Sequence, residues 1–467
     1  MRQFFAVLKD SFREAVDGFV IYVMLGLAAI IILVVASMSF TPVGPGEAFD
    51  AIGKRFAMTF PDKGRSRVIS ASRDNTYKAT DVQAEGDGYR LRLTVTGRSQ
   101  STTDGKHEAE KGDSFRRTVA AWSKMPGRTM KASDFAGEQG KGGQKGPDIE
   151  FTFNQEATAE EQRAVTDAQM EEFVKNQFAM HAGMDATARR VPAEEPTYAF
   201  DVTTSGGSAV RGWPHTMKLF FGTVTVSENA SLGQVLWIIE DQIINGLGGA
   251  LALLIGLIIT AFFIPNMLRK GSIDLLLSKP MGRSELLIYK YVGGLTFVFL
   301  VTAFTVGGIW LAIALRSGYW DPSFLAVIPL LTFTFAIVYA VSTAVAVFTR
   351  SPIAAMIVSI GFMLFLYIVG QVKSVFDSIR VEDRGGNIPE WAFTLVSTLN
   401  NVLPRYKDLD KLTSKLIADG TLTEGERRMV GLASIEYPSW GATFGVSLVF
   451  IVLVLALSCL RMSRRDY

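Results

Sequence analysis

Apolar residues in this chain are gathered in runs of about 20, and the charged residues lie between the runs. A helix needs about 20 apolar residues to cross a bilayer, and in lipid its backbone must satisfy its own hydrogen bonds. Six runs meet this length: Phe19–Phe40, Ile243–Ile264, Tyr291–Leu315, Ser323–Phe348, Ile353–Gly370 and Gly441–Leu460. The pattern predicts a polytopic α-helical membrane protein with six transmembrane helices.

None of these runs contains Asp, Glu, Lys, Arg or His. Ionisable groups inside a membrane mark proton and ion pathways. Their absence argues against a proton-coupled carrier and favours an energy source outside the membrane. The first run has a second interpretation as a secretory signal, which would leave five spans. Its length and the lack of a small-x-small cleavage site disfavour that interpretation.

Basic residues follow the short segments on one side of the predicted bundle. They are Arg2, Lys9, Arg13, Arg269, Lys270, Lys279, Arg283, Lys290, Arg350, Arg461, Arg464 and Arg465. The one short segment predicted on the other side carries only Arg316. By the positive-inside rule, both termini are predicted to be cytoplasmic. The net charge of +2 gives no reason to expect nucleic acid as a partner, and the single Cys459 excludes an internal disulfide.

The spacing of the runs divides the chain into five parts. They are an interfacial helix (1–17) with the first span (1–40), a mixed α+β extracytoplasmic domain (41–235), spans two to five (236–370), a second extracytoplasmic segment (371–440), and the last span with a basic tail (441–467). In the second extracytoplasmic segment, Pro389–Leu403 is apolar enough to re-enter the outer leaflet, and Asp408–Asp419 has a helical pattern.

Within the α+β domain, alternation of apolar and polar residues predicts strands. They are Tyr89–Thr96, Asp148–Phe153, Tyr198–Thr203 and Thr216–Ser227. Thr158 and Glu161 have the spacing of a capping box, which predicts a helix from there to about Met180. Ser99–Pro147 is rich in Gly, Lys, Ser and Asp and is expected to be a loop.

Motifs for enzymatic chemistry are not found. The chain has no Gly-x-x-x-x-Gly-Lys-Ser/Thr sequence, so it is not expected to hydrolyse ATP. His107, His181 and His215 lie far apart in sequence without a ligand pattern around them, so no metal site is expected. The chain is therefore predicted to be non-catalytic and to hold no cofactor of its own.

Polar residues inside the runs have two interpretations. They could line a path across the bilayer, or they could form hydrogen bonds between and within helices. They are Asn245, Thr260, Thr302, Thr305, Ser342, Thr343 and Ser359.

Pro265–Lys290 is the short basic segment between the second and third runs. Its apolar residues could dock in a cleft of a partner, Gly271 would allow close backbone approach, and Pro280 would end a helix. Ser284 is expected to cap the helix that follows. Physical reasoning leaves two interpretations open: a segment that receives force from a soluble partner, or a basic connector lying on lipid phosphates.

The sequence Lys270-Gly-Ser-Ile-Asp-Leu-Leu-Leu-Ser-Lys-Pro-Met-Gly-Arg-Ser-Glu285 resembles the coupling segment of permease subunits in the type-2 exporter family of ABC transporters. Phe-Arg-Glu14 before the first run and Ser463-Arg-Arg-Asp466 after the last are also similar to that family, including permeases linked to multi-copper enzyme maturation or gliding. The family has an acidic residue where Lys270 stands. The resemblance does not cover 41–235.

The resemblance implies an exporter permease that works with two copies of a separate ATPase, which would bind ATP and Mg. It also implies a second permease subunit, either a copy or a paralogue, and allows a periplasmic protein or lipoprotein as partner. The residues it assigns to ATPase coupling are Leu268, Arg269, Lys270, Gly271, Asp274, Leu275, Ser278, Lys279, Pro280 and Arg283. The alternatives are mechanotransmission to a periplasmic partner and a membrane receptor or scaffold without a motor.

Overall fold

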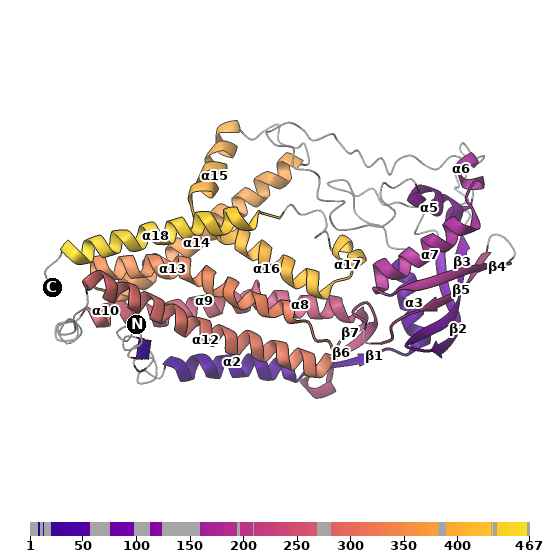
Figure 1. Cartoon of the computed structure of the whole chain (residues 1–467), viewed down its shortest axis with the longest axis horizontal. Helices are drawn as coiled ribbons and strands as arrows, with labels where there is room; N and C mark the ends of the chain where they lie inside the picture. The colour runs from indigo at the N-terminus through magenta and orange to yellow at the C-terminus, as the bar shows by residue number, and fades with distance from the viewer. Residues whose placement is uncertain are drawn as a thin grey trace.

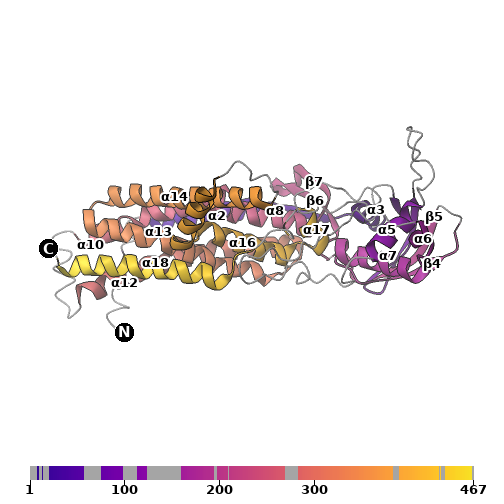
Figure 2. The ribbon, with the colours of Figure 1, turned by 90° about the horizontal axis from the view of Figure 1, so that it is seen from above.

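The computed structural model describes residues 8–9, 13, 20–56, 75–97, 113–123, 159–193, 197–208, 210–268, 282–381, 389–430, 432 and 437–464. The molecule is elongated, with a helical bundle along most of its length and an α+β part at one end (Figures 1 and 2). The interfacial helix predicted for 1–17 and the strand predicted for Asp148–Phe153 lie outside the described residues, apart from 8–9 and 13.

Long apolar helices form the bundle. Among the described residues, four helices are long and apolar enough to cross a membrane: α12 (Arg283–Ser317), η3 with α13 (Pro322–Ala326 and Val327–Thr349), α14 (Pro352–Val381) and α18 (Trp440–Arg464). The first and second predicted spans contain shorter apolar helices, α2 (Val20–Ala36), α9 (Leu247–Thr260) and α10 (Phe263–Met267). Helix α13 is central: 56% of its most apolar 18-residue stretch is buried, against 28–39% of the corresponding stretch in the other three long helices.

The two ends of the bundle differ. Helix α10, the first residues of α2 and the last turn of α18 lie at one end, and the α+β part lies beyond the other (Figure 1). The chain therefore leaves the bundle toward the α+β part after α2 and returns through α8 (Leu232–Ile244), which is separated from α9 at Asn245 and Gly246.

Two antiparallel sheets build the α+β part. One has three strands in the order β1 (Ser39–Pro42), β6 (Pro214–Leu219) and β7 (Val224–Ser231). The other has four in the order β2 (Asn75–Glu85), β3 (Gly88–Gly97), β5 (Thr197–Thr204) and β4 (Ala186–Val191). Helices α3 (Pro45–Phe56), α5 (Ser114–Ser123) and α7 (Asp167–Ala182) supply the apolar side chains that cover one face of the four-stranded sheet.

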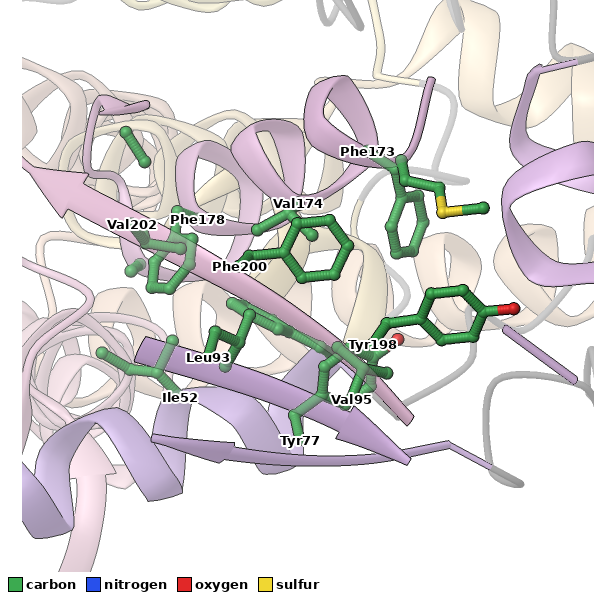
Figure 3. Packing of buried hydrophobic residues seen from close by; sticks show 14 of the residues in the cluster. Ile52, Tyr77, Leu93, Val95, Phe173, Val174, Phe178, Tyr198, Phe200 and Val202 are labelled. Atoms are coloured by element: carbon green, nitrogen blue, oxygen red, sulfur yellow. The ribbon is translucent and has the colours of Figure 1, made fainter. Parts of the chain in front are cut away.

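The core between these helices and the sheet follows the strand register. Leu93 of β3 lies opposite Phe200 of β5, and both side chains are buried together with Phe173 and Phe178 of α7 (Figure 3). Because side chains alternate along a strand, the intervening residues of the sheet face away from this core. Trp213 closes the core at the end nearest the bundle, stacking on Tyr89 at 5.4 Å between ring centroids.

Three helices lie between the fifth and sixth predicted spans. They are α15 (Glu390–Val402), α16 (Tyr406–Thr421) and α17 (Glu424–Met429). Helix α16 confirms the helical pattern predicted at Asp408–Asp419, and its Leu409 and Leu412 are buried against the bundle. Helix α15 covers the predicted Pro389–Leu403 segment, but its relation to a membrane stays a prediction.

Three local expectations were wrong. Thr216–Ser227 is not one strand, because Phe220, Phe221 and Gly222 adopt positive φ and reverse the chain between β6 and β7. The helix predicted from Thr158 to about Met180 is interrupted between α6 (Ala159–Arg163) and α7.

The capping box at this second start is formed by Thr166 with Gln169, and Gly183 in the left-handed conformation ends α7. The segment Ser99–Pro147 contains helix α5, in which Phe115, Val119 and Trp122 recur at helical spacing and enter the core.

Candidate functional site

The predicted coupling segment follows α10 and precedes α12 in the chain, and these two flanks lie at the end of the bundle farthest from the α+β part (Figure 1). Residues 269–281 lie outside the described residues, so eight of the ten predicted coupling residues are not placed by the structure: Arg269, Lys270, Gly271, Asp274, Leu275, Ser278, Lys279 and Pro280. The two that are described, Leu268 and Arg283, stand at the two ends of the connection. Their part in coupling stays a prediction.

Both flanks of the connection are packed into one apolar cluster. Leu268, just after α10, is 5% exposed, and Leu286 and Leu287 in the first turn of α12 are fully buried. The same cluster contains Val347 near the end of α13 and Met462 near the end of α18. Because a close-packed cluster deforms little, a force applied between α10 and α12 would move these helix ends together.

Helix α12 begins differently from the sequence prediction. Its first residue is Arg283, and Gly282 is the N-cap. The backbone N–H of Gly282 donates to Glu285 Oε2 at 3.4 Å. The carboxylate of the third helical residue thus supplies the hydrogen-bond acceptor for the N-cap N–H. Ser284 therefore lies inside the first turn and is not the cap.

Three of the seven polar residues predicted in the spans bond to their own helices. The hydroxyls of Thr260, Thr305 and Ser359 each donate to the carbonyl four residues earlier, at 2.8, 2.8 and 2.6 Å. Such bonds satisfy a hydroxyl without a partner helix. This geometry suits internal hydrogen bonding as well as it suits a polar path.

The remaining predicted polar residues are spread along the bundle. Ser342 and Thr343 are buried in α13, and the Thr343 hydroxyl has no hydrogen-bond partner among the described residues. Thr302 is half-buried on α12. Asn245 caps the end of α8 and donates to Asp241 at 2.9 Å and to Ser414 of α16 at 2.8 Å. Whether these residues line a path stays a prediction.

A buried polar cluster, which we call the Arg55 junction, joins three separate parts of the chain. Arg55 at the end of α3 donates to the carbonyl oxygen of Gly212 at 2.8 Å, and its Nη1 lies 3.7 Å from Glu426 Oε1 in α17. The hydroxyl of Ser231, the N-cap of α8, also donates to Glu426. Burial lowers the pKa of Arg55, and the negative charge of Glu426 opposes that shift.

Glu426 also holds α17 itself. Its Oε2 accepts from the backbone N–H of Thr423 at 2.9 Å, completing a capping box. The side chain of Glu426 is 2% exposed. His181 lies beside Arg55 and is fully buried, and this burial lowers the pKa of its imidazole to about 3. The junction therefore connects the α+β part, the start of α8 and the segment before α18. Sequence analysis missed it, since its members are hundreds of residues apart.

The family model described as ABC-2 family transporter protein matches residues 125–467, well over half of the chain. The chain belongs to the ABC-2 transporter family. No curated protein and no solved structure matches it. The resemblance found in the membrane part is thus confirmed at the level of the ABC-2 family, and the chain is a multi-pass membrane subunit of ABC transporter type. The match also covers the second half of the 41–235 region, which the sequence resemblance did not.

Contact between α8 and α16 adds a second polar site to this ABC-2 protein, at the start of the second predicted span. Asp241 accepts from Asn245 and, at 2.6 Å, from the hydroxyl of Ser414. One helical turn before Ser414 along α16, burial raises the pKa of Asp410 to about 6, despite Lys407 Nζ at 3.5 Å. The surroundings of this carboxylate therefore disfavour its charged form.

The outer face of the four-stranded sheet carries a shallow cleft of about 420 Å³. It is lined by Arg90, Thr187, Ala188, Arg189, Asp201 and Thr203. Arg92 on the same face pairs with Asp201 at 3.0 Å, and both side chains are about half exposed. None of the residues predicted from the sequence as functional lines this cleft.

Proposed function

We propose that this ABC-2 protein is the permease subunit of an ATP-driven exporter in a bacterial inner membrane. It would cross the membrane six times, pair with a second permease subunit and work with two copies of a separate ATPase. The observation that carries the proposal is the family match together with the position of the α10–α12 connection. Its flanks, α10 and the start of α12, lie at the same end of the bundle as the start of α2 and the end of α18.

In this proposal the ATPase presses on the connection when it binds and hydrolyses ATP. The buried flanks Leu268, Leu286 and Leu287 would carry the displacement into α12, α13 and α18, which end on the same cluster. The bundle would then change between two packed arrangements, because packed helices shift as rigid bodies. The predicted orientation, with this end in the cytoplasm, follows from the basic residues.

Mechanotransmission is the second candidate, and the Arg55 junction favours it. Buried contacts connect the α+β part to α17 and to the start of α8, the helix that leads into the bundle. Work done on the bundle could thus reach the α+β part and a periplasmic protein or lipoprotein without any substrate crossing. A receptor or scaffold without a motor, the third alternative, would purify without an ATPase.

The test uses the full chain co-expressed with its ATPase and reconstituted in nanodiscs. We expect Gly271→Trp to reduce the ATPase activity of the complex severely while the chain still inserts. The matched control is Gly44→Trp at the other end of the molecule, where nothing lies within 4 Å of an added Cβ. Equal activity of the two variants and the unmodified complex would contradict coupling through this segment, and absence of any ATPase from the purified protein would favour the receptor.

A further inference from the structure

The turn between β6 and β7 places large apolar side chains in an unfavourable backbone conformation. Phe220, Phe221 and Gly222 have φ of 49°, 56° and 98° in succession. Glycine and asparagine adopt such angles at low cost, whereas an aromatic residue at positive φ is strained. Two phenylalanines here therefore imply a stabilising contact for their rings that offsets the strain.

The described residues leave both rings largely uncovered. Phe221 is 72% exposed, more than any other large hydrophobic residue in the described part of the chain, and Phe220 is 56% exposed. Val224 and Val226 on β7 extend the same apolar surface. The five residues 220–224 carry no charge, and the nearest charged residue before them is Lys218. We call this surface, residues 220–226, the phenylalanine tip.

The phenylalanine tip lies against the end of the bundle, beside α2. The backbone N–H of Phe221 donates to the carbonyl of Ser37 at 2.8 Å, and Ser37 directly follows α2. Helix α2 itself exposes an apolar stripe that includes Ile30 and Leu33. The tip therefore continues the apolar outer surface of the bundle, as the position of β6 and β7 at the end of α2 shows (Figure 1).

The phenylalanine tip lies at about the same height along the bundle as two tryptophans near the end of α12. Arg316 at the end of α12 donates to the carbonyl of Met38 at 2.7 Å, so the ends of α2 and α12 are level. Trp320, three residues beyond α12, is 55% exposed and packs edge-on against Trp310. Exposed tryptophans of this kind mark the boundary between hydrocarbon and headgroups in membrane proteins.

We propose that the phenylalanine tip inserts into the lipid bilayer, in the leaflet on the side of the α+β part. Phe220 and Phe221 would enter the boundary of the acyl chains, and Lys218 would extend its amine toward lipid phosphates. The three-stranded sheet would then be held to the membrane surface as well as to the bundle. This inference requires only that the bundle spans a membrane and does not depend on ATP coupling or on the direction of transport.

Because Cys459 is the single native cysteine, one substitution removes all background labelling. In a Cys459→Ala background of the full chain, Phe221→Cys is labelled with a nitroxide and reconstituted in nanodiscs of phosphatidylcholine and phosphatidylglycerol. Its collision rates with oxygen, which concentrates in lipid, and with a water-soluble nickel complex are measured by electron paramagnetic resonance. Leu33→Cys on the exposed face of α2 is the lipid reference, and Thr187→Cys on the outer face of the four-stranded sheet is the aqueous reference.

We expect the label at residue 221 to follow the lipid reference, with a high oxygen rate and a low nickel rate. A label that follows the aqueous reference would overturn the proposal. Spin–spin broadening at residue 221 would show that a second copy of the chain covers the tip and would also overturn it. Phe220→Cys provides a second reporter on the same turn, so that a failure of one variant to insert leaves the test intact.

Discussion

The Arg55 junction offers the sharpest test of how the α+β part is held. Glu426→Gln keeps the shape of the side chain and one oxygen to accept from Thr423, but removes the charge that faces Arg55. Two charges about 4 Å apart attract by about 4 kcal/mol at the effective dielectric of a protein. Loss of one partner of a buried pair costs about 3–5 kcal/mol. Since Arg55 keeps the carbonyl of Gly212 as an acceptor, we expect the lower end, about 3 kcal/mol.

This loss should appear as local opening, which hydrogen exchange measures residue by residue. A change of about 3 kcal/mol lowers protection factors by about a hundredfold. The amides that report it are Val430, which donates to Glu426 across α17, and Gly233, which donates to Arg211 at the start of α8. Leu93 in the middle of the four-stranded sheet should keep its protection.

The matched control is Asp419→Asn. Asp419 of α16 forms an ion pair at 2.6 Å with Arg427, which is the neighbour of Glu426 in α17. The side chain of Asp419 is 43% exposed, and exposed ion pairs contribute about 0–1 kcal/mol to stability. Equal protection of Val430 and Gly233 in Glu426→Gln and in the unmodified chain would refute the reasoning. So would an equal loss of protection at Leu93, which would indicate opening of the whole α+β part.

Two further predictions concern the bundle and its polar rim. A Cβ at Gly294 would lie 2.5 Å from the hydroxyl of Tyr339, which is fully buried, so Gly294→Ala should destabilise the protein by about 1–3 kcal/mol and lower its melting temperature in detergent. Gly307→Ala on the same helix meets nothing within 4 Å and should leave the melting temperature unchanged; equal effects of the two variants would contradict close packing at Gly294. For Asp410, a folded-state pKa raised from 3.8 to about 6 stabilises the protonated folded form, so its contribution is complete below pH 4 and is lost as the pH rises through 6. Asp410→Asn should therefore stabilise the protein by up to about 3 kcal/mol at pH 7.5 and by about half as much at pH 5, so that its melting temperature rises more at the higher pH. A rise of equal size at both pH values would contradict the burial of this carboxylate.

The apolar runs and the strands with strict alternation could be predicted from the sequence. Their signal lies within one short stretch of consecutive residues, as in Tyr89–Thr96, which is part of β3. The turn at Phe220 could not be predicted in this way. Phe220, Phe221 and Thr223 are β-formers, and a single Gly222 inside a strand pattern is also compatible with a bulge. The pairing of β6 with β7 and the contact to Ser37 fix the reversal.

The junction and the interruption before α7 show two further limits. Arg55, Ser231 and Glu426 come together through tertiary packing, so no local pattern connects them. The break at Thr166 had a signal, because Thr166 and Gln169 have the same capping spacing as Thr158 and Glu161. Sequence alone could not choose between the two starts, since either agrees with the apolar side chains that follow.

The way the α+β part is attached limits how it can move. Two covalent connections, after α2 and before α8, and the non-covalent contact with α17 hold it at its end nearest the bundle. A body tethered by one flexible linker swivels freely, whereas one held at several points does not. If α2, α8 and α17 shift along the bundle axis relative to one another, the α+β part would therefore tilt as a rigid body. The displacement would be largest at the edge of the four-stranded sheet farthest from the bundle.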